Sequence, residues 1–168
     1  TQYGDLALLL APHELQLCPA GAPITEISPV ELGGAPYLKF HLAGTLDDHG
    51  LYELGTLATL RSFFQYYEVL GDQAGPFLRP ITTTFAPSLP PDILTTRRYR
   101  GKTNELLTHF LCNIAKFSSP LRDQPWGAVR LFDPLCGGGT TLLAGLILGA
   151  DVAGVEHDTQ DAQTTAAF

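Results

Sequence analysis

The distribution of apolar and polar positions predicts short strands and turns in the first part of the chain. Two apolar segments, 6–10 and 14–18, are separated by an Ala-Pro-His tripeptide, which favours a hairpin. A stretch rich in proline and glycine follows at 19–34, and residues 37–42 then alternate between apolar and polar with a period of two. That period is typical of a half-buried strand.

An amphipathic helix is predicted next, after a turn at 47–50. Leucine and aromatic side chains recur every three or four residues from Leu54 to Tyr67, and the pattern ends near Gly71. Since this spacing places aromatic rings on the apolar face of a helix, we interpret them as core residues rather than as a platform for stacking bases. The rings concerned are those of Phe63, Phe64, Tyr66 and Tyr67.

Five prolines within 73–92 indicate a connector between an accessory region and a second domain. Beyond it, Thr103 or Asn104 can cap a helix, whose first turn carries the favourably placed acid Glu105. The chain is therefore divided into an accessory α+β region at 1–72, a connector at 73–96 and the beginning of a second domain at 97–168.

The pattern changes again after a loop at 118–127. An apolar strand is predicted at 129–132, a helix at 141–148 and a second strand at 152–155, with a glycine turn between the first strand and the helix. Strand, helix and strand in this order form a βαβ unit, in which the two strands are parallel. The expected fold class is therefore α/β, with the start of a parallel sheet in the second domain.

The composition fits a soluble globular protein. Of the 168 residues, 45% are hydrophobic and 16% are charged, which is apolar enough to bury a core. No apolar run reaches the roughly 18 residues that cross a bilayer, and no basic start precedes an apolar signal segment. We therefore expect a cytoplasmic protein without membrane contact. The three cysteines are widely spaced, which argues against a disulfide framework and against a metal site.

The net charge of −7 comes entirely from the first 72 residues, where nine acids meet two bases. Nucleic-acid-binding domains are usually basic overall, so any phosphate contact is expected to be local. The candidate is a short basic stretch, for which a solvated loop is an equally good interpretation. It consists of Arg97, Arg98, Arg100 and Lys102.

The segment that carries candidate chemistry runs from Asp133 through three glycines to two threonines. Glycines between a strand and a helix allow a tight turn and the close approach of a ligand, toward which the helix directs its free N–H groups. Glu156 ends the next strand, 19 residues after Gly137, where a carboxylate can accept hydrogen bonds from both hydroxyl groups of a ribose. The sequence therefore predicts a site for an adenosine-type ligand.

The residues around the glycines narrow the choice of ligand. No lysine follows them, as a P-loop for nucleoside triphosphates requires, and Leu142 stands where a dinucleotide-binding motif needs its third glycine. Asp133 would repel a pyrophosphate, whereas its carboxylate suits a ligand that carries an amino group and a sulfonium. These features favour S-adenosylmethionine. Cys136 has no paired histidine and is interpreted as a small residue beneath the loop rather than as a nucleophile.

The nonapeptide Asp-Pro-Leu-Cys-Gly-Gly-Gly-Thr-Thr at 133–141 resembles the first cofactor motif of class I S-adenosylmethionine-dependent methyltransferases. Its DP(F/L/M)CGSGT form is typical of enzymes that methylate amino groups of RNA or DNA bases, including the RNA methylases related to the tRNA guanine N2-methyltransferases. Gly154-Val155-Glu156 is similar to their second motif, and 98–107 to the segment that leads into the helix before their sheet. The resemblance covers about 97–158 and implies a Rossmann-like domain. It implies cofactor contacts from Asp133, Pro134, Cys136, Gly137, Gly138, Gly139, Thr140, Thr141 and Glu156, with Gly138 in place of the usual serine.

One part of the family pattern does not occur in the sequence. Base-amino methyltransferases carry a (D/N)PP(Y/F) motif on the fourth strand that holds the target amino group, and this tetrapeptide is absent. We therefore expect a fragment of a methyltransferase that acts on nucleic-acid bases, RNA rather than DNA. By itself the fragment is expected to be inactive and to self-associate through open sheet edges. Two alternatives stay open: methyl transfer to a small molecule or a protein, and a non-catalytic interaction module on the same scaffold.

Overall fold

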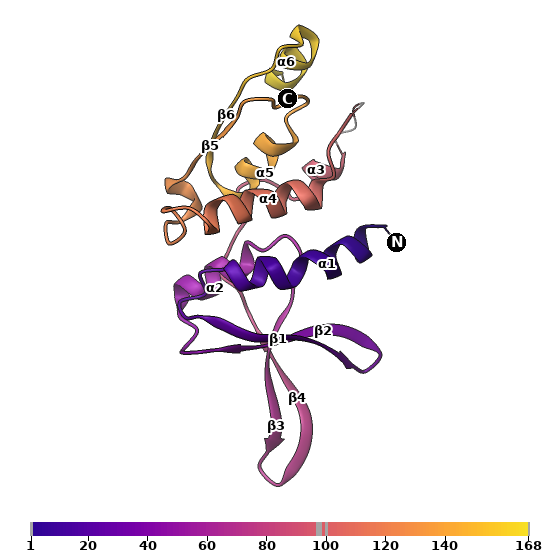
Figure 1. Cartoon of the computed structure of the whole chain (residues 1–168), viewed down its shortest axis with the longest axis vertical. Helices are drawn as coiled ribbons and strands as arrows, with labels where there is room; N and C mark the ends of the chain where they lie inside the picture. The colour runs from indigo at the N-terminus through magenta and orange to yellow at the C-terminus, as the bar shows by residue number, and fades with distance from the viewer. Residues whose placement is uncertain (1, 97–98, 100, 168) are drawn as a thin grey trace.

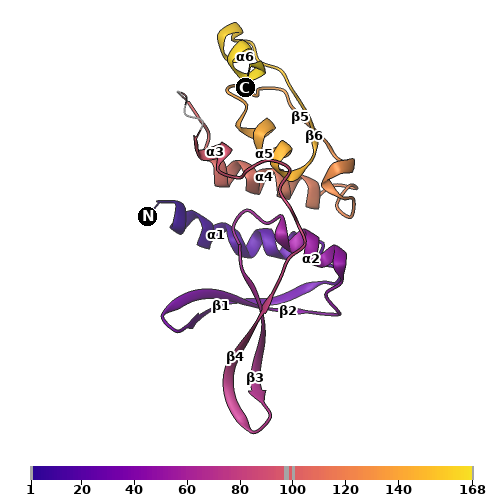
Figure 2. The same ribbon diagram turned by 180° about the vertical axis from the view of Figure 1, so that it is seen from behind.

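Figure 1 presents the computed structural model, which describes residues 2–96, 99 and 101–167. The molecule is elongated, with two β-hairpins at one end, a short parallel sheet and the last helix at the other, and the remaining helices between them (Figures 1 and 2). The elements in chain order are α1 (Gln2–Leu17), β1 (Ile24–Leu32), β2 (Ala35–Leu42), α2 (Asp48–Gly55), β3 (Phe63–Leu70), β4 (Gln73–Ile81), α3 (Ile93–Thr96), α4 (Glu105–Phe117), the 3-10 helix η1 (Trp126–Ala128), β5 (Arg130–Asp133), α5 (Thr140–Leu148), β6 (Asp151–Gly154) and α6 (Thr159–Ala166).

Helix α1 replaces the hairpin predicted at 6–18, so that prediction was wrong. The helix continues through Pro12, although an internal proline costs about 3 kcal/mol. Ala11, Leu15 and Cys18 are buried, and their spacing of four and three residues places them on one face of a helix. Burial of this apolar face favours a helix on both sides of the proline, whereas the sequence pattern alone was interpreted as a break.

The helix predicted over 54–67 and the turn predicted at 47–50 were also wrong. Asp47 is the N-cap of α2, and its Oδ1 accepts a hydrogen bond from the N–H of Gly50 at 2.8 Å. Helix α2 ends at Gly55, and Phe63 begins strand β3. The segment between them bonds to α1 instead of continuing the helix, because the Glu14 carboxylate accepts hydrogen bonds from the backbone at 58–59. The aromatic residues of β3 are typical of strands.

Strand β4 lies inside the stretch predicted as a connector, so 73–81 is not an irregular linker. It pairs with β3 in an antiparallel hairpin, as β1 pairs with β2, and the strand predicted at 37–42 is confirmed as part of β2. Pro76 has no partner in the register with β3, and a two-stranded sheet leaves each strand one free edge, so prolines can be accommodated in β4.

Helix α4 belongs to two apolar cores. Its residue Phe117 packs with Leu15 of α1 and Leu54 of α2 in one core, while Cys112 joins Leu148 of α5 in the other. Both views place α4 between α1 and α5 (Figures 1 and 2). The predicted capping is confirmed for Asn104, whose Oδ1 accepts a hydrogen bond from the N–H of Leu107 at 2.9 Å.

The predicted βαβ unit is confirmed. Strands β5 and β6 are parallel, with Leu131 paired to Val152, and α5 connects them. Gly145 lets the helix approach the sheet, because a Cβ at this position would lie 2.7 Å from a methyl carbon of Val152. The fold is thus mixed α/β, with its described strands in two-stranded sheets. None of the described helices is long and apolar enough to cross a membrane.

Candidate functional site

The glycine loop, residues 137–139, joins the region after β5 to the start of α5. Gly137 and Gly139 have φ angles of +49° and +82°, in the left-handed region that favours glycine. The N–H of Gly139 donates to the Cys136 carbonyl at 2.7 Å, and α5 begins directly afterwards at Thr140. The prediction of a tight glycine turn with positive φ between a strand and a helix is therefore confirmed.

Glu156 follows β6 and binds the backbone of the glycine loop. Its Oε2 accepts a hydrogen bond from the N–H of Gly137 at 2.7 Å, and its Oε1 accepts one from the N–H of Asp158 at 2.8 Å. The N–H groups of Asp158 and Gly137 lower the pKa of the Glu156 carboxyl below its ordinary value. The side chain is therefore an ionised acceptor held against the loop. An ionised carboxylate has about four acceptor positions, so hydrogen-bonding capacity remains for a ligand.

Asp133 is the last residue of β5 and pairs in the strand register with Gly154, the last residue of β6. Its Oδ1 accepts a hydrogen bond from the N–H of Leu135 at 3.0 Å, which fixes the carboxylate beside the first turn of the loop. Asp133 therefore ends β5, and Glu156 follows the end of β6. This arrangement creates a negative rim around a backbone turn.

The side chain of Cys136 is half-buried and lies against Gly154 of β6, so the expectation of a buried cysteine is met only in part. Gly154 of β6 leaves room for it, since a Cβ at position 154 would come within 2.8 Å of the Cys136 sulfur. Desolvation, followed by the charges of Asp133 and Glu156, raises the pKa of this thiol. A thiol that holds its proton is a poor nucleophile, so the position supports a packing role.

Tyr99 is a residue of the site that the sequence interpretation missed. Its ring lies directly on the glycine loop, where a Cβ on Gly138 would overlap it, and its hydroxyl is hydrogen-bonded to the buried Thr140 hydroxyl. The signal in the sequence was Gly138 itself. A glycine where the resembling motif has serine indicates that a neighbouring group fills the space.

The remaining predicted residues are distributed as follows. Pro134 is exposed and Thr141 is half-buried at the start of α5. Within the basic stretch, Arg97, Arg98 and Arg100 lie outside the described residues. Lys102 forms an ion pair with Glu105 and donates to the Leu94 carbonyl, so its ammonium group is engaged within the protein.

The described part of the chain contains no group of three or more His, Cys, Asp or Glu side chains that could hold a metal ion. No protein-family model matches the chain, and no curated protein or solved structure is significantly similar to it.

Proposed function

We propose that the chain carries the S-adenosylmethionine-binding part of a methyltransferase that acts on amino groups of nucleic-acid bases, RNA rather than DNA. The observation that carries this proposal is the contact of Glu156 with the N–H of Gly137, at 2.7 Å. It holds an ionised carboxylate beside a glycine turn, at the carboxyl ends of two adjacent parallel strands. Nucleosides bind at this position in open parallel sheets.

Charge favours S-adenosylmethionine over a phosphate ligand. The N-terminus of α5 would attract an anion by itself, but Asp133 and Glu156 add two carboxylates to the rim of the same turn. A phosphate bound beside these two carboxylates would be repelled, because like charges close together raise the free energy. A ligand with a sulfonium and an amino group turns both carboxylates into attractive partners, and its ribose offers hydroxyl donors.

Each residue then has a distinct part in the proposed site. Glu156 would accept hydrogen bonds from the ribose hydroxyls, and Asp133 would face the cationic end of the ligand. The glycines allow the ligand to approach the backbone without meeting a Cβ. When bound, S-adenosylmethionine supplies an activated methyl group on sulfur. The contribution of the protein to such a transfer is mainly to orient donor and acceptor. A Rossmann-like sheet that extends the β5–β6 pair belongs to the same proposal.

The acceptor is proposed from the DPLCGGGTT motif, whose form is typical of base-amino methyltransferases. The motif that holds the target amino group in those enzymes does not occur in this sequence. We therefore expect no methyl transfer from the chain by itself when it is incubated with labelled S-adenosylmethionine and total RNA or DNA.

Binding of S-adenosylmethionine to this chain tests the proposed donor site. Equilibrium dialysis with labelled S-adenosylmethionine should detect weak binding, and Glu156→Ala should weaken it about tenfold or more, the scale of a lost charge-assisted hydrogen bond. Asp151→Ala is the matched control, because Asp151 is an exposed acid at the opposite end of β6. Absence of binding, or equal loss in both variants, would remove Glu156 from the site and contradict the proposal.

A further inference from the structure

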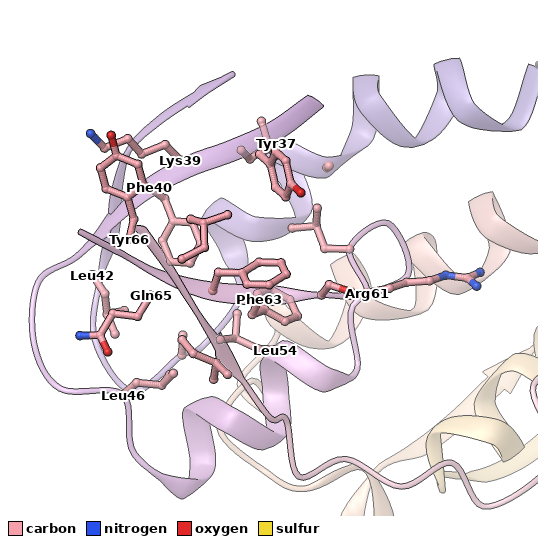
Figure 3. A pocket seen from close by; sticks show the side chains of 18 of the residues that line it. Tyr37, Lys39, Phe40, Leu42, Leu46, Leu54, Arg61, Phe63, Gln65 and Tyr66 are labelled. Carbon is pink, nitrogen blue, oxygen red and sulfur yellow. The ribbon is translucent and has the colours of Figure 1, made fainter. Parts of the chain in front are cut away.

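A large groove lies beside the two hairpins of the N-terminal region (Figure 3). Its volume is about 1620 Å³. Residues of both hairpins (β1 to β4), of α1, α2 and α4, and of the segment between α2 and β3 line it. Sites for small molecules usually enclose about 300–1,000 Å³. The groove is therefore of a size that suits a segment of a polymer better than a single small ligand.

Most of the charged side chains that line the groove are positive. Lys39, Arg61 and Arg79 are the three lysines and arginines within residues 2–96, and all three line the groove. The same range contains ten aspartates and glutamates, of which only Glu68 does so. A chain with a net charge of −7 thus concentrates the positive charge of this region in one concave surface. Such a surface attracts an anionic partner.

Two of these cations are available to a partner. Arg61 and Arg79 are exposed, and neither guanidinium has a carboxylate of any described residue within 4.0 Å. Lys39 is 3.1 Å from Glu68 in an exposed ion pair, which is worth little in water. Figure 3 places Lys39 at one end of the groove and Arg61 at the other, so the positive charge is spread along the groove.

Aromatic rings line the same groove as these cations. Tyr37, Phe64 and Tyr66 line the groove and are half-buried. The rings of Tyr37 and Phe64 meet edge to face, with centroids 6.1 Å apart, and the Lys39 ammonium lies 4.4 Å from the centroid of the Tyr66 ring. Positively charged grooves with aromatic rings are typical of proteins that bind single-stranded nucleic acid, since bases stack on the rings while cations follow the phosphates.

We infer that this groove binds single-stranded nucleic acid, with Arg61 and Arg79 contacting phosphates and the tyrosines stacking on bases. A duplex offers its bases only at their edges, so the rings favour an unpaired strand. The site lies outside the segment that resembles methyltransferases and includes no residue of the glycine loop. Failure of S-adenosylmethionine binding therefore leaves this inference standing, and failure of nucleic-acid binding leaves the donor site standing.

Fluorescence anisotropy tests the inference on the intact chain, with a labelled, unstructured RNA of about 12 nucleotides and a DNA of the same sequence, both in low salt. The double variant Arg61→Gln/Arg79→Gln should weaken binding about tenfold, and it should reduce the slope of log Kd against log salt by about 1.4 for two lost phosphate contacts. Arg130→Gln is the matched control, because Arg130 is an exposed arginine on β5, outside the groove. It should change neither quantity beyond the general effect of one charge.

Two further measurements test the role of the aromatic rings. Tyr66→Leu should weaken binding of the oligonucleotide but not of heparin, a polyanion without bases. Photocrosslinking of RNA to the unaltered chain, mapped by mass spectrometry, should label peptides that contain Tyr37 or Tyr66. This measurement does not depend on whether any variant folds. The inference is overturned if neither RNA nor DNA binds, or if Arg130→Gln weakens binding as much as the double variant does. It is also overturned if Tyr66→Leu weakens heparin binding as much as RNA binding, or if an acidic peptide at equal concentration displaces RNA completely.

Discussion

Tyr99 and Gly138 form a contact that limits which side chains the glycine loop can carry. Gly138 is not among the glycines with positive φ, so its backbone would accept any residue. What excludes a side chain is the Tyr99 ring, which is held in place by the hydrogen bond to Thr140. Position 138 therefore requires a glycine because of the space taken by the Tyr99 ring, and not because of its backbone conformation.

Gly138→Ala should therefore destabilise the chain by about 1–3 kcal/mol, the usual cost of overpacking. In a Tyr99→Ala background the same substitution should cost little, because the ring that it would meet is gone. Urea unfolding of the four chains of this double-mutant cycle measures the coupling. Additive effects of the two substitutions would show that Tyr99 does not rest on Gly138 in solution.

His109 gives the buried interface between α2 and α4 a dependence on pH. Its Nε2 donates to the Thr56 carbonyl at 2.9 Å, and desolvation lowers the pKa of the ring below 6.5, while the charge of Glu14 partly opposes this shift. The folded state thus binds the proton less readily than the unfolded state. The contribution of this group to stability is complete above pH 6.5 and is lost as the pH falls through the lowered pKa.

The free energy of unfolding should consequently fall between pH 7.5 and pH 5, and part of that fall should be missing in His109→Gln. Glutamine keeps an amide donor for Thr56 but has no titrating group. Unfolding curves of both chains across this pH range give the difference, in which the contributions of the other histidines cancel. Parallel pH profiles for the two chains would contradict the assignment.

At the scale of elements, α4 joins the two halves of the molecule through buried polar side chains. Lys116 is buried and lies 2.6 Å from Glu53 of α2, and it also donates to the Arg122 carbonyl at 3.0 Å. Burial raises the pKa of the Glu53 carboxyl, although the bond from Lys116 opposes that shift. Glu53 therefore depends on Lys116 for the compensation of its charge.

Lys116→Met should destabilise the chain by about 3–5 kcal/mol, because it leaves the Glu53 carboxylate buried without a cation. Adding Glu53→Leu should recover much of this loss, since replacing both partners of a buried ion pair by apolar residues is often neutral or stabilising. Trp126, the only tryptophan, has its ring centroid 5.5 Å from the Lys116 ammonium, and its fluorescence reports unfolding. A double variant as unstable as Lys116→Met would refute the charge argument.

The elements that could be predicted from sequence are those whose determinants are local. The glycine turn and the Asn104 cap depend on residues a few positions apart, and the βαβ unit on elements that follow one another directly in the chain; all three are confirmed. The strand β4 was missed because its prolines were interpreted as a connector, although it forms a local hairpin with β3, whereas the end of α2 depends on distant contacts. The end of α2 is set by hydrogen bonds from 58–59 to Glu14, across more than forty residues, and the period of 54–67 fitted a helix equally well.

The candidate site divides in the same way. Glu156 could be paired with Gly137 from their spacing and the order of the elements, because a parallel βαβ unit brings those positions together. The groove could not be found, because Phe64 and Tyr66 were assigned to a helix, in which they do not share a face. On a strand, residues two apart do share a face.

At the scale of the whole molecule, the parallel sheet has an uncovered apolar surface. Phe132 of β5 is 62% exposed and Val155, just after β6, is 54% exposed. Strands β5 and β6 pair with each other and with no further described strand, so each has a free edge. Apolar residues beside free strand edges are typical of surfaces that pair with other chains.

The purified chain should therefore self-associate in a concentration-dependent manner. Phe132→Ser should shift the equilibrium toward the monomer, whereas Leu111→Ser, which removes a comparably exposed side chain from α4, should not. Sedimentation equilibrium over a range of concentrations measures both. A monomer at every concentration would mean that the open sheet is not an association surface.

Glu14 has a consequence for the order in which the chain becomes structured during synthesis. Its carboxylate is fully buried and takes up donors from the backbone at 58–59, from the Thr59 hydroxyl and from Asn113, 99 residues further along. Until Asn113 has left the ribosome, one of these donors is missing and the surface that covers α1 is absent. The first 72 residues are thus completed as a structure only when α4 arrives, because until then Glu14 Oε1 keeps the Ala58 N–H but lacks the Asn113 donor and the surface that buries the carboxylate.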